Sequence, residues 1–295
     1  MGTRKTGVYR ERAERRRRTQ GTGEARGDGW QRTEADEQLL RLATRYSTLT
    51  LHQAAYACWG GRIEAARRRV RLMAEAGLLR RSAEVRWAGT VVWTTERGAR
   101  VAGVGLGAPH PPGERLLHRL ALADVGLRLE AQGHTVLAER EVRTAEAAPG
   151  RAAELLADLG VPVVHEGTRG EPLLAVRAGA RAVHWPDLLL VLPGEGVAAV
   201  EVELTAKTPG SLRQILRAYG QARRRVLYLA TAPVVRQLQG RPGPAGQWTD
   251  GVAQDVGLLP SGGPDPGTGG LLRVRPFAAV DPAVDRQAAR HAQRR

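Results

Sequence analysis

The sequence predicts an α+β protein whose two folded units lie between two basic ends. Apolar residues recur at helical spacing between Thr33 and Gly77, and two short strand-like runs follow them. Two apolar, strand-like runs at 183–192 and 196–204 are separated by the turn sequence PGEG. Helical and strand-like runs alternate around that pair, which is typical of an α/β unit with a mixed central sheet.

The composition favours a polyanionic partner. The 295 residues contain 45 Lys and Arg against 30 Asp and Glu, a net charge of +15. Nearly all of the basic residues are Arg, the side chain suited to bidentate phosphate contacts. A GC-rich genome explains part of the preference for Arg over Lys but not the net excess, which we attribute to binding a polyanion such as DNA.

Cysteine usage and hydropathy predict a cytoplasmic protein. A single cysteine, Cys58, excludes an intramolecular disulfide framework and a thiolate zinc cluster, and it fits a reducing compartment. The first residues are charged from Arg4 onward and contain no apolar core of a signal peptide. No apolar stretch approaches the roughly 18 residues of a membrane span, so we expect no membrane partner.

The first 104 residues predict a disordered arm and a DNA-binding unit. Residues 1–30 contain the run Arg15–Arg18 and few apolar residues, and we expect a disordered basic arm that either attracts phosphates or is merely solvated. Residues 31–104 predict three helices, ADEQLLRLATRY, STLTLHQAAYACWG and RIEAARRRVRLMAEAG, with Gly77 ending the third. Two short strands turning at Ala88-Gly89 follow. This order is that of a winged helix-turn-helix.

The third of these helices is the expected DNA-contacting element, because the third helix of such a unit enters the major groove. Ile63, Ala66, Val70 and Met73 share one narrow arc, which leaves an arginine-rich face outward. The predicted DNA-binding residues are Arg62, Arg67, Arg68 and Arg71, with Arg86 on the wing. The alternative is a solvated helix face, and winged helices also mediate protein contacts.

After a Gly- and Pro-rich linker at 103–113, residues 113–238 predict the second unit. Its expected order is a helix at 114–133, a strand at 134–143, the two strands around PGEG, a helix at 208–225 and a further strand. Residues 147–180 read as an irregular insert. Residues 239–295 are expected to be a Gly/Pro-rich and basic C-terminal tail. Its segment from RPGPAGQWTDG through SGGPDPGTGG is too rich in Gly and Pro for a packed element, and the part after Pro282 is expected to fray.

The acidic residues of the central strands predict a metal site. Period-2 alternation sends Glu201 and Glu203 to one face of their strand, and the hairpin places Asp187 opposite them. Three converging carboxylates repel one another unless a cation neutralises them, and hard oxygen ligands suit Mg²⁺ or Mn²⁺. Lys207, four residues after Glu203, can approach the same site and stabilise charge on a phosphate. A metal held this way promotes phosphodiester hydrolysis. The alternative is a half-exposed edge strand on which acidic and apolar residues alternate.

Pro186-Asp187, Glu201-Val202-Glu203 and the following lysine and helix resemble the core of PD-(D/E)XK nucleases. The wider pattern resembles the replication-relaxation family of actinobacterial plasmids and integrative elements. Its matching segments, over roughly residues 35–235, are a winged helix, LLHRLALADV (116–125), an E-R-E-like strand (Glu139-Arg140-Glu141), the PD strand and LRQILRAYGQA. The resemblance implies kinship with restriction-endonuclease-like conjugative relaxases, which nick plasmid DNA at a transfer origin.

The resemblance also implies roles for individual residues. Asp187 and Glu201 correspond to the two metal-binding acids, and Glu203 stands where the motif usually has Lys. Some nucleases of this fold use Glu there, whereas others with a degraded motif only bind DNA. Lys207 is a candidate for the missing role. Glu139 is either an additional acid of the site or a surface residue.

Three further residues have structural interpretations that we prefer to catalytic ones. His184 is expected to support a ligand of the site or to lie on the surface, rather than to be a ligand itself. His118 is expected to pack or cap on its helix, and Tyr219 to pack against the sheet rather than act as a covalent nucleophile. None of the seven histidines forms a His-x-His triplet, which disfavours relaxases of the histidine-cluster type.

Two functional hypotheses follow from these patterns. In the first, the protein binds double-stranded origin DNA and nicks it. The catalytic residues would be Asp187, Glu201, Glu203 and Lys207, with Mg²⁺ or Mn²⁺ bound by the three acids. In the second, it is a non-catalytic replication or transfer factor, or a transcriptional regulator, whose nuclease fold is a scaffold. Relaxosome or replication proteins and a second copy of the chain are the expected further partners.

Overall fold

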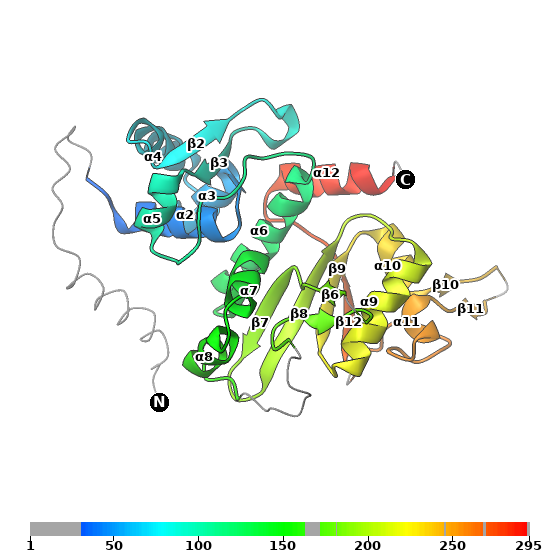
Figure 1. The fold of residues 1–295 in the computed structure, drawn as a ribbon. Coiled ribbons are helices and arrows are strands. Elements are labelled where there is room, and N and C mark those ends of the chain that lie inside the picture. Colours follow the sequence, from blue (N-terminus) through cyan, green and yellow to red (C-terminus); the bar gives the residue numbers. More distant parts are fainter. Residues whose placement is uncertain (1–30, 163–171, 181, 245, 268–269, 294–295) are drawn as a thin grey trace, which may run out of the picture. The chain divides into compact units, whose positions relative to one another are not determined.

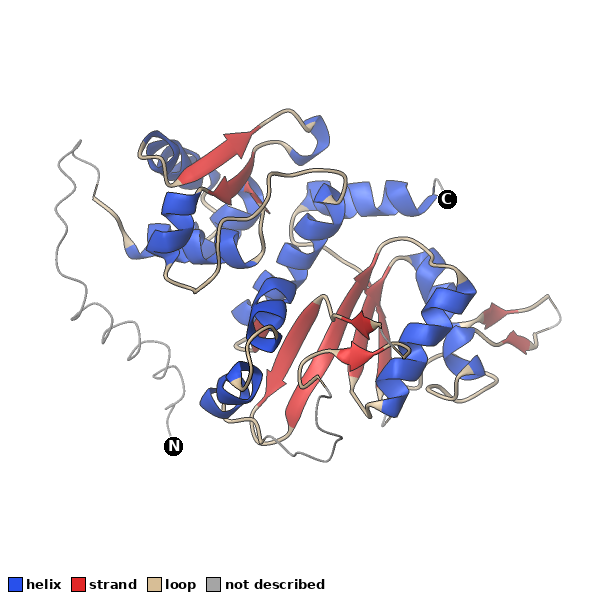
Figure 2. Cartoon of the chain, viewed as in Figure 1, coloured by secondary structure: helices blue, strands red, loops and turns tan. Residues whose placement is uncertain are grey.

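The computed structural model describes residues 31–162, 172–180, 182–244, 246–267 and 270–293. The arm expected over residues 1–30 lies outside the described residues, and so does a part of the expected insert at 147–180. The described chain is a mixed α and β structure built around a mixed central sheet (Figures 1 and 2). Every helix within these ranges is too short or too polar to cross a lipid bilayer.

The N-terminal part of the described chain contains helices and a small antiparallel sheet. Its elements are α2 (Glu34–Arg45), β1 (Leu49–Thr50), α3 (Leu51–Trp59), α4 (Ile63–Glu75), β2 (Leu79–Ser82), η1 (Arg86–Ala88), β3 (Val91–Thr94) and α5 (Glu96–Ala102). β3 pairs antiparallel with both β1 and β2, so the strand order is β1-β3-β2. The expected sequence of three helices followed by two paired strands is therefore present.

Local sequence signals explain where these helices begin and how they pack. Thr33 and Thr50 cap α2 and α3, and in each case the residue three positions later, Asp36 or Gln53, bonds back to the capping residue. On α4, Ala66, Val70 and Met73 are buried at the expected helical spacing, whereas Ile63 is half-buried. The narrow apolar arc thus leaves Arg67, Arg68 and Arg71 on the outer side of α4.

The central sheet has five strands in the order β12-β9-β8-β7-β4. The strands are β4 (Thr135–Ala138), β7 (Leu188–Leu192), β8 (Gly196–Glu203), β9 (Val226–Ala230) and β12 (Leu272–Pro276). β7 runs antiparallel to both β4 and β8, whereas β8, β9 and β12 run parallel to one another. β7 and β8 form the expected hairpin, in which Leu188 pairs with Val200.

Helices and short strands surround this sheet (Figure 1). They are α6 (Leu116–Ala131), α7 (Glu139–Glu146), α8 (Arg151–Asp158), β5 (Val176–Arg177), β6 (Val183–His184), α9 (Pro209–Gln221), α10 (Ala232–Gln239), β10 (Arg241–Pro242), β11 (Trp248–Thr249), α11 (Val252–Asp255) and α12 (Pro282–Gln293). Ala199 of β8 and Tyr228 of β9 belong to the same apolar core as Leu216 and Tyr219 of α9. Side chains on this face of β8, which include Glu201 and Glu203, therefore lie toward α9.

Buried polar contacts join the N-terminal elements to α6 and to the end of the chain. Gln53 donates from Nε2 to the carbonyl oxygen of Leu120 at 2.8 Å. Arg45 forms an ion pair with Glu130 at 2.7 Å. The Thr50 hydroxyl donates to Oδ2 of Asp281 at 2.5 Å. These contacts link α2, α3, α6 and the segment before α12.

The strand expected over 134–143 is shorter than predicted. β4 ends at Ala138, and Glu139 begins α7, so Glu139-Arg140-Glu141 are helical. The Glu141 carboxylate accepts the Ala138 N–H at 2.8 Å, and Val142 and Ala145 are buried at a spacing of three residues. The apolar period changes from two to three at this point, and the capping interaction fixes the start of the helix. The expectation that 147–180 is irregular is also wrong in part, since α8 lies within it.

The expectation that no packed element follows residue 239 is wrong. β12 pairs in parallel with β9 and extends the central sheet, with Leu272 and Val274 buried. Helix α12 buries Val284 and Ala288 and contacts α6. Gly- and Pro-rich connections set β12 apart, and its pairing partner lies more than forty residues earlier. A composition-based argument cannot register such a long-range pairing.

Candidate functional site

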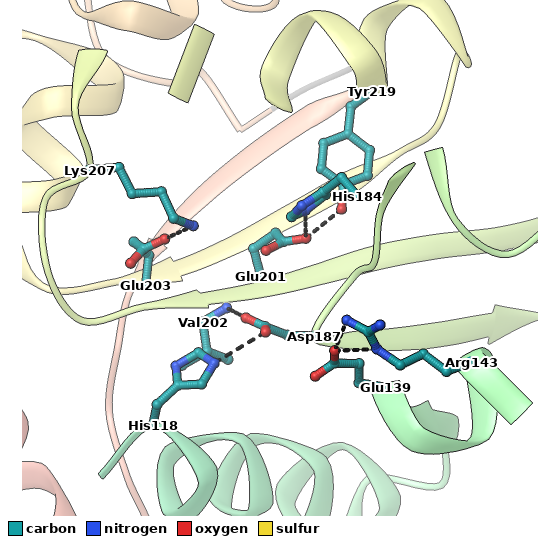
Figure 3. A network of polar contacts seen from close by, with 10 residues as sticks. All are labelled: His118, Glu139, Arg143, His184, Asp187, Glu201, Val202, Glu203, Lys207 and Tyr219. Carbon is teal, nitrogen blue, oxygen red and sulfur yellow. Dashed lines mark hydrogen bonds and ion pairs between the residues drawn. The ribbon is translucent and has the colours of Figure 1, made fainter. Parts of the chain in front are cut away.

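The β7–β8 hairpin holds Asp187 beside the acidic positions of β8. The strand expected over 183–192 contains Asp187, but β7 begins only at Leu188, so Asp187 directly precedes it. Oδ2 of Asp187 accepts the Val202 N–H at 2.9 Å. Because Leu188 pairs with Val200, the register brings Asp187 next to Glu201. The expected position of Asp187 opposite Glu201 is therefore present. The expected convergence of three carboxylates is not, since Asp187 contacts the Val202 N–H and His118 whereas Glu201 contacts His184 and Tyr219 (Figure 3).

Glu201 is the most enclosed acid of this group, with 2 % of the residue exposed. Its Oε1 lies 2.9 Å from Nε2 of His184 and also accepts a hydrogen bond from the Tyr219 hydroxyl. Burial and then the charge of Asp187 raise the pKa of Glu201, against the two hydrogen bonds. The ionised form of Glu201 is therefore disfavoured at this buried position.

Two histidines support the acids from opposite sides. His118 of α6 lies with Nε2 3.2 Å from Oδ1 of Asp187, and His184 contacts Glu201. Burial lowers the pKa of each histidine, but the hydrogen bond and charge of its carboxylate outweigh burial and raise the pKa overall. The expectation that His118 is only packed or capped is therefore incomplete, since its ring contacts Asp187.

Glu203 forms an ion pair with Lys207, four residues later. Burial lowers the pKa of Lys207, but the charge of Glu203, together with those of Glu201 and Asp187, raises it overall. One ammonium group therefore interacts with all three acids. The side chain of Lys207 is 34 % exposed, so it borders the solvent as well as the cluster.

These side chains line a cavity of about 1270 Å³. Glu139 lines the same cavity, and its Oε1 forms an ion pair with Arg143 at 2.6 Å. The guanidinium of Arg143 also lies over the ring of Trp185, 4.9 Å from its centre. The Glu139 carboxylate is thus paired with Arg143 (Figure 3).

Tyr228 is a buried neighbour of the acids that the sequence analysis missed. It pairs with Glu201 across the parallel strands β8 and β9, and it is fully buried. Its hydroxyl has no hydrogen-bond partner within the described ranges. Burial and then the charges of Glu201, Glu203 and Asp187 raise its pKa well above the ordinary value. The single signal in the sequence is a polar-tipped residue inside the apolar run VLYLA.

The acids provide oxygen donors of the kind that Mg²⁺ and Mn²⁺ prefer. Asp187 and Glu201 lie close enough for the charge of one to raise the pKa of the other, and the unpartnered Tyr228 hydroxyl lies beside them. These donor atoms are of the type that a hard divalent cation prefers. As the side chains lie, however, no group of three or more His, Cys, Asp or Glu residues in the described part of the chain is arranged to hold a metal ion.

The predicted DNA-contacting arginines lie on the surface. Arg62, Arg67, Arg68 and Arg71 are exposed on α4 or at its start, and Arg86 is exposed in η1. Arg67 and Arg71 form exposed ion pairs with Glu64 and Glu75 of the same helix.

Arg69 differs from these arginines. It forms an ion pair with the fully buried Asp36 of α2, so its role is to hold α4 against α2. The separation of outward and inward arginines on α4 therefore depends on a partner in another helix.

Comparison of the chain with protein-family models, with curated proteins and with solved structures gave no match.

Proposed function

We propose that this is a cytoplasmic DNA-processing protein of a plasmid or integrative element, which binds origin DNA and nicks it with a divalent metal. The observation that carries the proposal is that Asp187, Glu201, Glu203 and Lys207 line one cavity, with Asp187 beside Glu201 in the register of the β7–β8 hairpin. The order of elements and the acid spacing support the resemblance to a winged helix joined to a PD-(D/E)XK nuclease-like unit.

Duplex binding is assigned to α4. Its outward face presents Arg67, Arg68 and Arg71, and Arg62 lies at the start of the helix. An exposed guanidinium can donate two hydrogen bonds to a phosphate or to a guanine edge. Arg86 lies in η1, in the connection between the paired strands β2 and β3, which corresponds to the wing of a winged helix.

Cleavage is assigned to the acid cluster. Asp187 and Glu201 would hold the cation, with Glu203 beside them. Bound Mg²⁺ or Mn²⁺ polarises a phosphodiester and lowers the pKa of a water molecule. The Lys207 ammonium, whose pKa is raised by the charges of all three acids, can stabilise the negative charge that develops on the phosphoryl oxygens. His118 and His184 orient Asp187 and Glu201 through their hydrogen bonds.

The test is conversion of supercoiled origin plasmid to open circles with Mg²⁺ or Mn²⁺. We expect wild type to nick and Asp187→Ala and Glu201→Gln to lose at least a hundredfold in rate, since each removes a proposed metal ligand. Glu195→Gln, a change in an exposed ion pair with Arg225 away from the cluster, is the matched control. Absence of nicking by wild type, or equal nicking by Asp187→Ala, excludes the enzymatic proposal.

A second candidate is a non-catalytic replication or transfer factor with the same DNA-binding face. It is favoured by the partners that the acids already have: Lys207 on Glu203, His184 and Tyr219 on Glu201, and the Val202 N–H on Asp187. Titration calorimetry with Mn²⁺ separates the candidates. A scaffold binds Mn²⁺ no better than its Asp187→Ala variant, whereas a nuclease loses affinity in that variant.

A further inference from the structure

Three arginines at one edge of the cavity form no ion pair with an acid of the described ranges. Arg115 and Arg119 lie one turn apart at the start of α6, and Arg140 lies in the first turn of α7. None of the three forms an ion pair with a carboxylate of the described ranges. The other arginines and the lysine of the cavity differ: Arg143 binds Glu139, Lys207 binds Glu203, and Arg45 binds Glu130 and Glu141. Within the described ranges, the arginines of the cavity that lack an ion pair therefore lie at this edge.

The positions of Arg119 and Arg140 are fixed by backbone carbonyls rather than by opposite charges. Arg140 donates from Nη2 to the oxygen of Gly107 at 2.8 Å and from Nη1 to Thr44. Arg119 donates at 3.4 Å to His110 and Pro111. A guanidinium has five N–H donors, so both retain donors for a ligand.

Arg119 and Arg140 lie close enough to repel each other. Burial lowers the pKa of Arg140, and the charge of Arg119 lowers it further. The charges of Glu141 and Glu96 oppose this lowering, and an anion between the two guanidiniums would relieve their repulsion further. The start of α6 adds a further attraction for an anion, because the helix dipole is positive at this end.

The same helix connects this cationic edge to the acid cluster. His118, which contacts Asp187, is the residue before Arg119 on α6. A helical turn spans about 5.4 Å, so Arg115 and His118 are neighbours on one helix face. A ligand that reaches both the cationic edge and the acid cluster needs a negatively charged group beside the arginines and a reactive group beside the acids. A phosphodiester chain has this repeat.

We propose that Arg115, Arg119 and Arg140 bind a backbone phosphodiester of a DNA strand and direct the neighbouring phosphodiester toward Asp187 and Glu201. This subsite rests on the proposed function, because it would position DNA for cleavage at the acid cluster. It is separate from the α4 surface, because its residues belong to α6 and α7. The cavity of about 1270 Å³ exceeds the roughly 300–1,000 Å³ of small-molecule sites, which favours a polymer over a free anion.

The test measures binding without metal, so that it does not depend on cleavage. Fluorescence anisotropy with labelled eight-nucleotide DNA, single-stranded or duplex, is measured in EDTA over a range of salt. Arg115→Ala/Arg119→Ala is the main variant, since neither residue forms a short hydrogen bond. Arg140→Lys is the second. Arg241→Ala, an exposed arginine outside the cavity, is the control.

We expect the double variant to lose at least tenfold in affinity for one of the two DNA forms, and Arg241→Ala to lose less than twofold. The slope of log affinity against log salt should become shallower by about 0.7 per lost phosphate contact on a single strand and about 0.9 on a duplex. The form that responds identifies the strand state of the ligand. Arg140→Lys should keep part of the affinity, since it keeps the charge.

Affinities of the double variant within twofold of wild type for both DNA forms would overturn the subsite, whatever the nicking assay shows. The converse also separates the two ideas. Loss of oligonucleotide binding in the double variant, with no nicking by wild type under any metal, supports the subsite and removes only the nuclease proposal. Thermal unfolding of each variant establishes that it is folded before binding is compared.

Discussion

His184 and Glu201, seventeen residues apart in the chain, lie with Nε2 of the histidine 2.9 Å from Oε1 of the acid. Tyr219 donates its hydroxyl to the same oxygen, and its ring meets that of His184 edge-on, with the centres 5.6 Å apart. Strands β6 and β8 and helix α9 therefore meet at one buried carboxylate oxygen. The position of Glu201 depends on all three elements.

Two buried tyrosines give a matched test of this arrangement. Tyr219→Phe should lower the free energy of unfolding by about 1.5–3 kcal/mol, because it removes a hydrogen bond to a carboxylate. Tyr228→Phe should change it by less than about 1 kcal/mol, because the Tyr228 hydroxyl has no partner within the described residues. Urea unfolding measures both. Equal losses in the two variants would contradict the assigned contacts.

The ion pair between Asp36 and Arg69 should be a principal stabiliser of the N-terminal elements. Asp36 is fully buried, and Arg69 also donates from Nε to its Oδ1 at 3.0 Å. Asp36→Ala should cost about 3–5 kcal/mol of unfolding free energy, because it leaves a half-buried guanidinium without its acid. Glu64→Ala, which breaks an exposed pair with Arg67, should cost less than about 1 kcal/mol. Similar losses in both variants would refute this difference.

The same pair predicts an acid response. Burial alone raises the pKa of Asp36, but the hydrogen bonds from Arg69 and Thr33 outweigh it and lower the pKa below 3.8. A lowered folded-state pKa contributes stability above the unfolded value, which is lost as pH falls through the folded one. Wild type should therefore lose stability relative to Asp36→Asn only below about pH 4.

Asp124 should produce the opposite pH dependence. Burial is the main cause that raises its pKa to about 7, and the nearby Asp281 adds to it against hydrogen bonds from Gln53 and from the N–H groups of Asp281 and Val280. Because the folded state holds this proton more tightly, its stabilisation is complete below pH 3.8 and is lost as pH rises to about 7.

Asp124→Asn isolates this effect, since it removes the titration and keeps an oxygen acceptor. The stability of wild type relative to Asp124→Asn should fall between about pH 4 and 7, by at most about 1.4 kcal/mol per pH unit for one proton. Urea unfolding at half-unit intervals of pH measures the difference. A difference that is constant over this range would exclude a titrating Asp124.

The outward arginines of α4 should respond to salt when duplex DNA binds. Arg68→Ala should weaken binding and make the slope of log affinity against log salt shallower by about 0.9, the effect of one lost phosphate contact. Arg236→Ala, an exposed arginine on α10, serves as the control. Anisotropy with a duplex of about 20 base pairs measures both variants. An unchanged slope in Arg68→Ala would remove that residue from the interface.

Several elements follow from local sequence alone. The helical spacing of Ala66, Val70 and Met73 predicts the buried face of α4, and the PGEG turn predicts the β7–β8 hairpin. Alternation predicts that Glu201 and Glu203 share a face of β8. In each case the responsible interactions join residues that are close in the chain, so a pattern within about fifteen residues contains them.

Other features depend on partners that are distant in the sequence. β12 belongs to the central sheet because it pairs in parallel with β9, and α12 packs against α6. Arg69 is separated from the outward arginines by Asp36, and the unpartnered Tyr228 hydroxyl becomes relevant because β9 lies beside β8. Nothing in the neighbouring residues distinguishes these positions.

The amino-acid sequence by itself thus determined the α and β composition, the exposed basic helix face and the pairing of acids on one hairpin. Only the tertiary structure decided what each acid contacts, which arginines are neutralised and how the C-terminal segment packs. The physical reason is range. Periodicity and turn chemistry act over neighbouring residues, whereas burial, charge pairing and strand addition depend on side chains that the chain brings together from far apart.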